Sequence, residues 1–397
     1  SGITVIDVTT SVAVPFGAMI LADLGAEVIK IENPEGGDTA REWGKPLEGG
    51  GQRTGTFDAY NRNKRSVTLN LWDPDGQRRF RDLIARSDVL IQNLRPGSFE
   101  KMGLTPDALR KLNPRLIYCS SSGYGRQGPW ADQPGYDPLA QAFAGMPEMT
   151  GDADRRGVRV GVPIIDLGTG MWAAIGILGA LHRRAATGEG AVIETALFDT
   201  AMGWMSLAFS ELLNYQRAPK RMGTAGPAGV APNRHFPPAD GDIAIMAGHN
   251  GHFRKLCAAL ERPDLLEDER FKSSRSRSKF DEELAELVAA VTVTQPRAVW
   301  QERLTAQGVP HAPVHMLPEV LSHAQTRANG IVHAGRDGST EQVALPFKLD
   351  GKRLPYRMRS PGLGAATPAV VGAPGTGKAE ARATAQKKRR TQKSKQK

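Results

Sequence analysis

Short apolar runs alternate with helical patterns along the first third of the chain. Residues 3–8 are apolar and β-branched, and an apolar helix is expected to start near Pro15 and to continue to Leu24. Gly25 stops this helix, and residues 27–32 form the next apolar run. Strand, helix and strand in this order predict a βαβ unit.

The same pattern continues to residue 122. Apolar runs at 66–71, 88–94 and 116–122 are predicted strands, while Asp73-Pro74 and Thr105-Pro106 are typical of helix starts. Strands that alternate with helices build a mostly parallel sheet with helices on its faces. The first third of the sequence therefore predicts an α/β domain.

A second region follows a loop rich in Gly, Ala and Pro between residues 218 and 238, where the composition shifts. We expect a smaller domain here, with a strand followed by helices. The strand is predicted at residues 242–247, and the helices at 250–260, 278–290, 296–307 and 317–329. The sequence shows no internal repeat, which argues against a solenoid or a propeller.

Composition limits the class of protein. A chain of 397 residues with 40% hydrophobic content suits two or three globular units. The longest apolar stretch, residues 170–181, is shorter than the ~20 residues that a membrane helix needs. Cys119 and Cys257 both fall in apolar runs and do not suggest a disulfide scaffold. We expect a soluble, cytoplasmic protein.

The net charge of +10 is concentrated at the C-terminal end of the sequence. From Lys378 onward the chain holds nine Lys or Arg residues and one Glu, which leaves about +2 for the rest. This body gives no signal for nucleic-acid or membrane binding. We interpret residues 366–397 as a disordered, solvated basic tail, with a contact to nucleic acid or another acidic partner as the alternative.

Several patterns look like site motifs but lack a required feature. A GxGxxG pattern begins at Gly123, yet Pro129 follows where a nucleotide-binding helix should begin. Residues 372–378 nearly match a phosphate-binding loop without its final Ser or Thr. Residues 311–315 hold two histidines, but Pro313 breaks any helix that would present both to a metal ion. Nicotinamide, nucleoside triphosphate and metal sites are therefore not predicted.

One carboxylate stands at the entrance of the most apolar predicted helix. Asp166 follows Pro163 and precedes Gly168 and Gly170, within the run from 161 to 181. It suits the N-cap of this helix, which is the reading that the sequence alone favours. The alternative is a nucleophile, because Asp is ionised at neutral pH with a pKa of about 4 and the glycines let a thioester approach closely.

Several longer motifs decide between these readings, because in their residues and order the chain resembles the class III CoA-transferases. This family includes formyl-CoA transferase and, in a related branch, the α-methylacyl-CoA racemases. The likeness covers nearly the whole chain. The matching pieces are Asp7-Val8-Thr9 through Pro15-Phe16, residues 21–30, residues 61–66, residues 92–97, Gly135-Tyr136-Asp137, residues 166–170 and residues 187–190.

The resemblance implies an α/β protein of two domains. A large Rossmann-like, CoA-binding domain would comprise residues 1–215 and be completed by residues 330–365, with a smaller inserted α+β domain at residues 225–329. The resemblance also implies a homodimer whose two subunits are interlocked like links of a chain. Such threading would be an exception to the general absence of knots in proteins.

By the same resemblance, Asp166 attacks an acyl-CoA thioester and forms an acyl-aspartyl anhydride and free CoA thiolate. An acceptor carboxylic acid then exchanges in and CoA is returned, so the enzyme would be a transferase of sulfur-containing groups. CoA is a substrate in this scheme, and no permanently bound cofactor or metal is expected. The residues that the resemblance assigns to the CoA cleft are Val12, Leu69, Asn93, Lys101, Met102 and Tyr136.

Departures from the family pattern leave two alternatives open. The racemase branch carries a His at the position of Tyr136 and a Glu near the position of Asn250, and these two groups supply its acid and base. Since this chain has neither, the resemblance favours transfer over racemisation. Asn33 replaces an Arg that many members use for a CoA phosphate, while Trp72 replaces a common Lys and Ala13 replaces a Gln. The alternatives are an acyl-CoA racemase or epimerase of the same family, and a catalytically silent CoA-binding protein.

Overall fold

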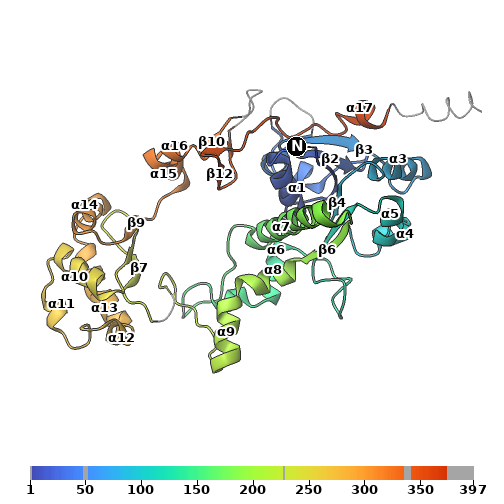
Figure 1. The fold of residues 1–397 in the computed structure, drawn as a ribbon. Helices are drawn as coiled ribbons and strands as arrows, with labels where there is room; N and C mark the ends of the chain where they lie inside the picture. Colours follow the sequence, from blue (N-terminus) through green and yellow to red (C-terminus); the bar gives the residue numbers. More distant parts are fainter. Residues whose placement is uncertain (1, 48–51, 227–228, 335–340, 373–397) are drawn as a thin grey trace, which may run out of the picture. The chain divides into compact units, whose positions relative to one another are not determined.

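The computed structural model describes residues 2–47, 52–226, 229–334 and 341–372, drawn in colour in Figure 1. The described chain forms two compact units. The first takes the described residues of Ser1–Ala144, Val160–Phe209 and Gly330–Lys397, and the second takes those of Gly145–Arg159 and Ser210–Asn329. Each unit has a hydrophobic core of its own.

The first unit is built on a six-stranded parallel sheet with the strand order β3-β2-β1-β4-β5-β6 (Figure 1). The strands are β1 (Thr4–Val8), β2 (Glu27–Glu32), β3 (Lys64–Thr68), β4 (Val89–Gln92), β5 (Ile117–Ser122) and β6 (Ala191–Ala196). The parallel sheet predicted from the sequence is confirmed. Strands are added on one side of β1 up to β3 and on the other side from β4, so the topological switch point lies between β1 and β4.

The helices of the first unit begin where the sequence supplies caps. Asp73 and Thr105 accept hydrogen bonds from backbone N–H groups of α3 and α5, as their positions before proline predict. The helical segments are α1 (Ala13–Asp23), η1 (Thr39–Glu42), α2 (Gly55–Asn61), α3 (Pro74–Ile84), α4 (Ser98–Lys101), α5 (Pro106–Leu112), α6 (Asp137–Phe143), α7 (Ile164–Thr187), α8 (Leu197–Trp204) and α17 (Thr367–Val371). A further helix, α9 (Ser206–Tyr215), crosses from the first unit into the second.

The helices α1 and α7 cross at two glycines. A Cβ atom added to Gly17 would lie 2.5 Å from the carbonyl oxygen of Gly170, and one added to Gly170 would lie 2.2 Å from that of Ala13. These distances are shorter than any van der Waals contact, so neither position can carry a side chain unless a helix moves. The crossing therefore fixes the α7 turn that directly follows Asp166.

By length and composition alone, α7 is the one helix in the described ranges that could cross a membrane. It has 24 residues, and its most apolar window has a mean hydropathy of 1.7, whereas the apolar stretch noted in the sequence was only residues 170–181. One side of α7, including Ile165 and Ile177, is buried in the first unit. The other side exposes large apolar residues, among them Trp172 and Ile175.

The end of the described chain returns to the sheet beside β3. The backbone N–H of Ala366 donates to the carbonyl of Ser66, and Val370 and Val371 of α17 pack against the core of the first unit. Two short hairpins precede this segment, β10 (Val332–His333) with β11 (Gln342–Val343) and β12 (Lys348–Leu349) with β13 (Lys352–Arg353). The predicted start of the tail at residue 366 is therefore too early, because Ala366, Val370 and Val371 pack against the core. Residues 373–397 lie outside the described residues.

The second unit combines a three-stranded antiparallel sheet with helices. The strands are β7 (Asn233–Phe236), β8 (Ile243–Met246) and β9 (His311–Pro313). The helical segments are η2 (Met146–Glu148), α10 (Asn250–Ala259), α11 (Asp264–Glu267), α12 (Ser274–Arg277), α13 (Asp281–Thr292), α14 (Arg297–Gln307), α15 (Leu317–Ser322) and α16 (Ala324–Asn329). The single helix predicted over residues 317–329 is wrong, because His323 adopts an extended conformation with ψ of 140° and separates α15 from α16.

Buried charges connect the first three strands of the sheet. The Lys64 ammonium donates to the Asp7 carboxylate at 2.9 Å, to the Asn61 side-chain oxygen at 2.9 Å and to the Pro15 carbonyl at 2.8 Å. The side chains of Lys64 and Asp7 are both 0% exposed. Burial lowers the pKa of Lys64 to about 8, although the charge of Asp7 opposes this shift. All three ammonium hydrogens thus have acceptors, which a buried ion pair requires.

A second buried pair extends this network into the loop between β1 and α1. Lys30 lies 2.8 Å from Asp38, and the other oxygen of Asp38 accepts from the Ser11 N–H at 2.8 Å and the Thr10 hydroxyl at 2.9 Å. Ser11 has a φ of 73°, in the left-handed region that residues with a side chain rarely adopt. Burial opposes ionisation of Asp38, but the charge of Lys30 still lowers its pKa. Fixed charges therefore hold the loop in an unfavourable backbone conformation.

Gly170→Ala is expected to separate α1 from α7 and to lower the free energy of unfolding by about 1–3 kcal/mol, as overpacking of a core does. Urea denaturation followed by circular dichroism measures the change. Gly55→Ala in α2 is the matched control, because its Cβ would meet no atom within 4 Å. Its effect is expected to stay below ~1 kcal/mol. Equal stabilities for the two variants would contradict the proposed role of the glycine crossing.

Lys64→Met is expected to lower the free energy of unfolding by about 3–5 kcal/mol, because it leaves the buried Asp7 carboxylate without its closest cation. Arg65→Met tests the neighbouring position on β3, where Arg65 pairs with Glu27 and the two side chains are 38% and 49% exposed. This exposed pair is expected to contribute less than ~1 kcal/mol. The same denaturation experiment compares them, and similar losses would show that burial does not set the strength of the network.

Candidate active site

Asp166 lies in the first turn of α7, and its side chain is half-buried. The helix begins at Ile164, and the N-cap residue is Pro163, which has no side-chain cap hydrogen bond. The N-cap role that the sequence favoured for Asp166 is therefore wrong, since its backbone is already inside the helix. Across the described residues, no group donates a hydrogen bond to the Asp166 carboxylate.

A different carboxylate caps this helix. Asp137, the first residue of α6, is buried, and its Oδ2 accepts from the backbone N–H groups of Ile165 at 2.7 Å and Asp166 at 3.1 Å. Burial and, second, the nearby charge of Asp137 raise the pKa of Asp166 to about 7. An aspartate with this pKa is a stronger base than an ordinary surface carboxylate.

Two aromatic rings lie near the first turns of α7. Phe16 of α1 and Tyr60 of α2 are 6.0 Å apart between ring centroids, in an edge-to-face arrangement. Burial and then the charge of Asp166 raise the pKa of the Tyr60 hydroxyl, which indicates that Tyr60 lies within electrostatic range of Asp166. Phe16 also reaches the α7 turn at Gly170. Phe16 thus links Tyr60 to the turn of α7 that follows Asp166.

Among the residues assigned to the CoA cleft, Asn93 and Val12 lie near the switch point of the sheet. The Asn93 side chain follows β4, and it accepts from the Thr10 N–H and donates to the Thr10 carbonyl, both at 2.9 Å. Val12 is buried at the N-cap of α1, two residues further along the same loop. Ligands of parallel sheets usually bind at such a switch point. Asn93 therefore holds the loop in place through both the oxygen and the NH2 group of its side-chain amide.

The other assigned residues fall in separate places. Leu69 and Met102 are buried in one hydrophobic cluster of the first unit, where they contribute packing. Lys101 is exposed and is the last residue of α4, and Met102 is the C-cap of the same helix. Tyr136 is 56% exposed directly before α6. Its neighbour in sequence, Asp137, connects this position to the turn of Asp166.

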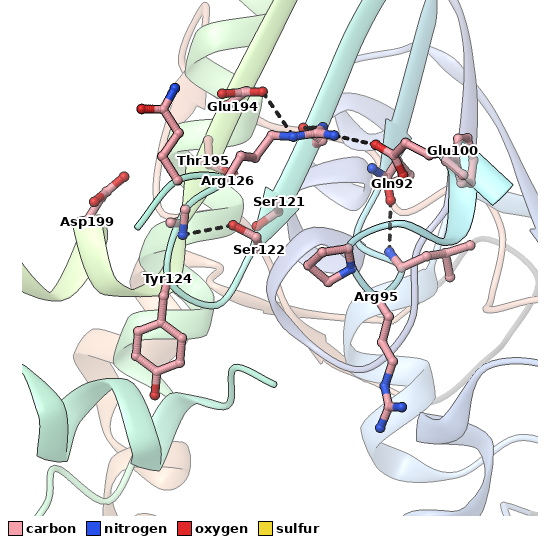
Figure 2. Close-up of a pocket in the computed structure, with 17 residues that line it drawn as sticks. Gln92, Arg95, Glu100, Ser121, Ser122, Tyr124, Arg126, Glu194, Thr195 and Asp199 are labelled. Atoms are coloured by element: carbon pink, nitrogen blue, oxygen red, sulfur yellow. Dashed lines mark hydrogen bonds and ion pairs between the residues drawn. The ribbon is translucent and has the colours of Figure 1, made fainter. Parts of the chain in front are cut away.

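The structure also contains a cleft that the sequence did not predict, with a volume of about 320 Å³ at the ends of β4, β5 and β6 (Figure 2). Figure 2 shows Arg126 reaching across it, with hydrogen bonds or ion pairs to Glu100 and Glu194. Neither Asp166 nor any residue assigned to CoA lines this cleft. The serines that end β5, Ser120 to Ser122, form part of its wall and were the available signal in the sequence.

Comparisons with known proteins place the chain among CoA-transferases. Residues 1–367 match the model of CoA-transferase family III. A succinate–glutarate CoA-transferase of Agrobacterium fabrum is 35% identical over 376 residues, which cover 92% of this chain and 92% of the relative. An acetyl-CoA:oxalate CoA-transferase of Acetobacter aceti is 35% identical over 356 residues, which cover 89% of this chain and 90% of the relative.

A solved structure agrees with the fold. The crystal structure of a CAIB/BAIF family protein from Brucella suis is similar with a TM-score of 0.85 and 34% sequence identity. The match covers 93% of this chain and 97% of the other. The similarity therefore extends over both units described above.

Proposed function

The chain belongs to CoA-transferase family III, as its motifs predicted, and we propose that it transfers CoA through a covalent intermediate on Asp166. The overall reaction exchanges CoA between an acyl-CoA thioester and a free carboxylic acid. The observation that carries the proposal is a half-buried carboxylate without hydrogen-bond donors among the described residues, at the start of α7. The two relatives are named for glutarate and oxalate, so dicarboxylic acids are the first acceptors to test.

The proposed transfer consists of two exchanges that mirror each other. A carboxylate oxygen of Asp166 attacks the thioester carbonyl carbon, the carbon–sulfur bond breaks, and CoA leaves as a thiolate. The thiolate then attacks the aspartyl carbonyl of the resulting anhydride, which releases the donor acid and leaves CoA on Asp166. The acceptor carboxylate attacks this aspartyl thioester, and the released thiolate finally takes up the acceptor acyl group and restores Asp166.

The raised pKa of Asp166 suits this chemistry. Burial and the charge of Asp137 raise it to about 7, so the ionised carboxylate is more basic and hence more nucleophilic than an ordinary aspartate. Only the ionised form can attack. We therefore infer that the transfer loses its nucleophile as the pH falls through about 7 and keeps it at higher pH.

CoA binds as a substrate in this proposal, near the segments that follow β1, β3, β4 and β5. We assign Val12, Leu69, Asn93, Lys101, Met102 and Tyr136 to its cleft. The exposed ammonium of Lys101 suits a CoA phosphate, and Asn93 fixes the loop of Val12 through Thr10. Both cysteines are buried free thiols, which supports a reducing, cytoplasmic setting.

The exposed side of α7 supports a homodimer. Met171, Ile175 and Leu178 recur at helical spacing, with exposed fractions of 41%, 52% and 43%. Next to them, the rings of Trp172 and Trp204 of α8 lie 5.9 Å apart. Contiguous apolar faces of this kind mark protein interfaces. We propose a second copy as the occupant, interlocked with the first, because a symmetric contact on α7 would shield both nucleophile-bearing helices at once.

Asp166→Asn is expected to lower kcat by about 10³-fold or more, as loss of a nucleophile does. The chemical test incubates wild-type protein with acyl-CoA thioesters and hydroxylamine, and mass spectrometry locates the hydroxamate. We expect the hydroxamate on Asp166 and only when a thioester is present.

The wild-type kcat/KM is expected to fall about tenfold per pH unit below about 7, because only the ionised Asp166 carboxylate can attack.

Asp107→Asn is the matched control, because Asp107 also lies in the first turn of a helix, α5, and is exposed. It should leave transfer and labelling unchanged. Bound CoA with no hydroxamate from any thioester would overturn the covalent mechanism. Exchange of the α-hydrogen of an acyl-CoA in heavy water would then identify a racemase. The absence of such exchange would identify a silent CoA-binding protein.

Light scattering at micromolar concentration is expected to give the mass of a dimer, because exposed apolar residues on α7 need a partner. Isotope-labelled and unlabelled dimers, mixed and analysed by native mass spectrometry, test the interlocking. Interlocked subunits should exchange only after unfolding and refolding. A monomeric mass would contradict the dimer, and rapid exchange of native subunits would contradict the interlocked arrangement.

A further inference from the structure

Asp137 makes more contacts than a simple helix cap needs. It is 4% exposed, and its Oδ2 receives two N–H groups from the first turn of α7, including that of Asp166 itself. The backbone position of Asp166 is therefore tied directly to a second carboxylate. The N-cap residue of α7, Pro163, has no side chain that could replace this contact.

The other oxygen of Asp137 is held from within α6. Gln141 is fully buried, and its Nε2 donates to Asp137 Oδ1 at 2.6 Å. Its Oε1 accepts from the Val160 N–H at 2.9 Å, on the segment that leads into α7. Asp137 and Gln141 together thus hold the chain before α7 and the first turn of α7 in one hydrogen-bonded group. Asp137 cannot turn away without breaking these bonds.

We propose that Asp137 is a positioning residue of the transfer reaction, which fixes the Asp166 carboxylate toward the thioester and strengthens it as a nucleophile through its own negative charge. This inference rests on the proposed nucleophilic role of Asp166. The capping role of Asp137 has a direct consequence for that nucleophile. Asp137 already accepts the hydrogen bonds of the free N–H groups at the start of α7. These donors are therefore not available to the Asp166 carboxylate, whose basicity they would lower.

The electrostatic part of the proposal depends on the groups near Asp166. Burial contributes most to its raised pKa and Asp137 contributes next, while α2 presents the neutral Tyr60 hydroxyl. Of the other helices packed against α7, α1 carries Asp23, which is paired with Arg62, and α8 carries Asp199, which lines the separate cleft. Asp137 is therefore the neighbouring charge whose effect on the Asp166 carboxylate a single substitution can remove.

Asp137→Asn removes the charge but keeps the helix cap, because the amide oxygen of Asn can accept the same two N–H groups while its NH2 group faces the Gln141 amide. We expect the pH midpoint of transfer to fall by about one unit, since an adjacent like charge raises a carboxyl pKa by about that much or more. Asp137→Ala removes the cap as well. It should lower kcat by about 10²-fold, as a small displacement of a reacting group does, with a smaller effect on KM.

Two readouts are measured on the whole 397-residue chain. The first is the pH dependence of hydroxamate formation at Asp166 with an acyl-CoA donor. The second is a carbon-13 NMR titration of aspartate-labelled protein, in which the Asp166 signal is assigned by its loss in Asp166→Asn. Asp73→Asn, which alters the corresponding carboxylate cap of α3, is the matched control and should shift neither midpoint.

Lower midpoints in both readouts for Asp137→Asn, with unchanged midpoints for Asp73→Asn, would support the inference. Midpoints of Asp137→Asn that coincide with those of the wild type would overturn it. If wild-type protein forms no adduct, the proposed function fails by itself, and the NMR titration still decides whether Asp137 controls the ionisation of Asp166. The two failures are therefore distinguishable.

Discussion

The close crossing of α1 and α7 is the constraint on which the site depends. Gly17 and Gly170 allow the two backbones to touch, and Asp166 lies one turn before this contact on α7. Since the crossing admits no side chain, the position of α7 relative to the sheet is set by backbone atoms. Among the residues that the structure describes, no group donates to the oxygens of Asp166, so the backbone of α7 sets the position of this carboxylate. A nucleophile needs this combination, because each donor bound to the carboxylate would reduce its basicity.

The same unit fixes the loop between β1 and α1 with buried charge. Lys30 and Lys64 hold Asp38 and Asp7, and Asp38 in turn keeps Ser11 in a left-handed conformation. Replacing such ion pairs by apolar residues would often leave stability unchanged, so stability does not explain them. Their effect is one defined loop conformation at the switch point of the sheet. We therefore interpret this network as one that sets the loop geometry beside the proposed CoA cleft.

Local patterns predicted the sheet well and long-range contacts poorly. Residues 27–32 were predicted as a strand and form β2, because a β-branched run followed by turn residues has few alternatives. β6 was not predicted, since residues 191–196 carry Glu and Thr among their apolar residues. The helix over 317–329 is interrupted at His323, although no Pro or Gly marks the break.

For the site, the motifs identified Asp166 as the candidate nucleophile, but its N-cap reading failed. The residue that caps α7 is Asp137, which comes 29 residues earlier in the sequence than Asp166 and reaches it only through the packing of α6. No local pattern could show this contact. The cleft around Arg126 was missed for a similar reason, because its carboxylates come from α4 and β6, which are distant in sequence and are bridged by Arg126.

Asp137 and Asp166 divide between them two roles that one aspartate cannot combine. An acidic side chain at a helix N-terminus gains stability when it accepts the free N–H groups, and the same hydrogen bonds lower its basicity. A carboxylate that must attack a thioester needs the opposite environment, dry and without donors. In this fold Asp137 accepts the N–H groups and Asp166 remains without them, at a pKa raised to about 7 by burial and by its neighbour. The helix cap and the proposed nucleophile are therefore different carboxylates, and they are coupled, because Asp137 both caps α7 and raises the pKa of Asp166.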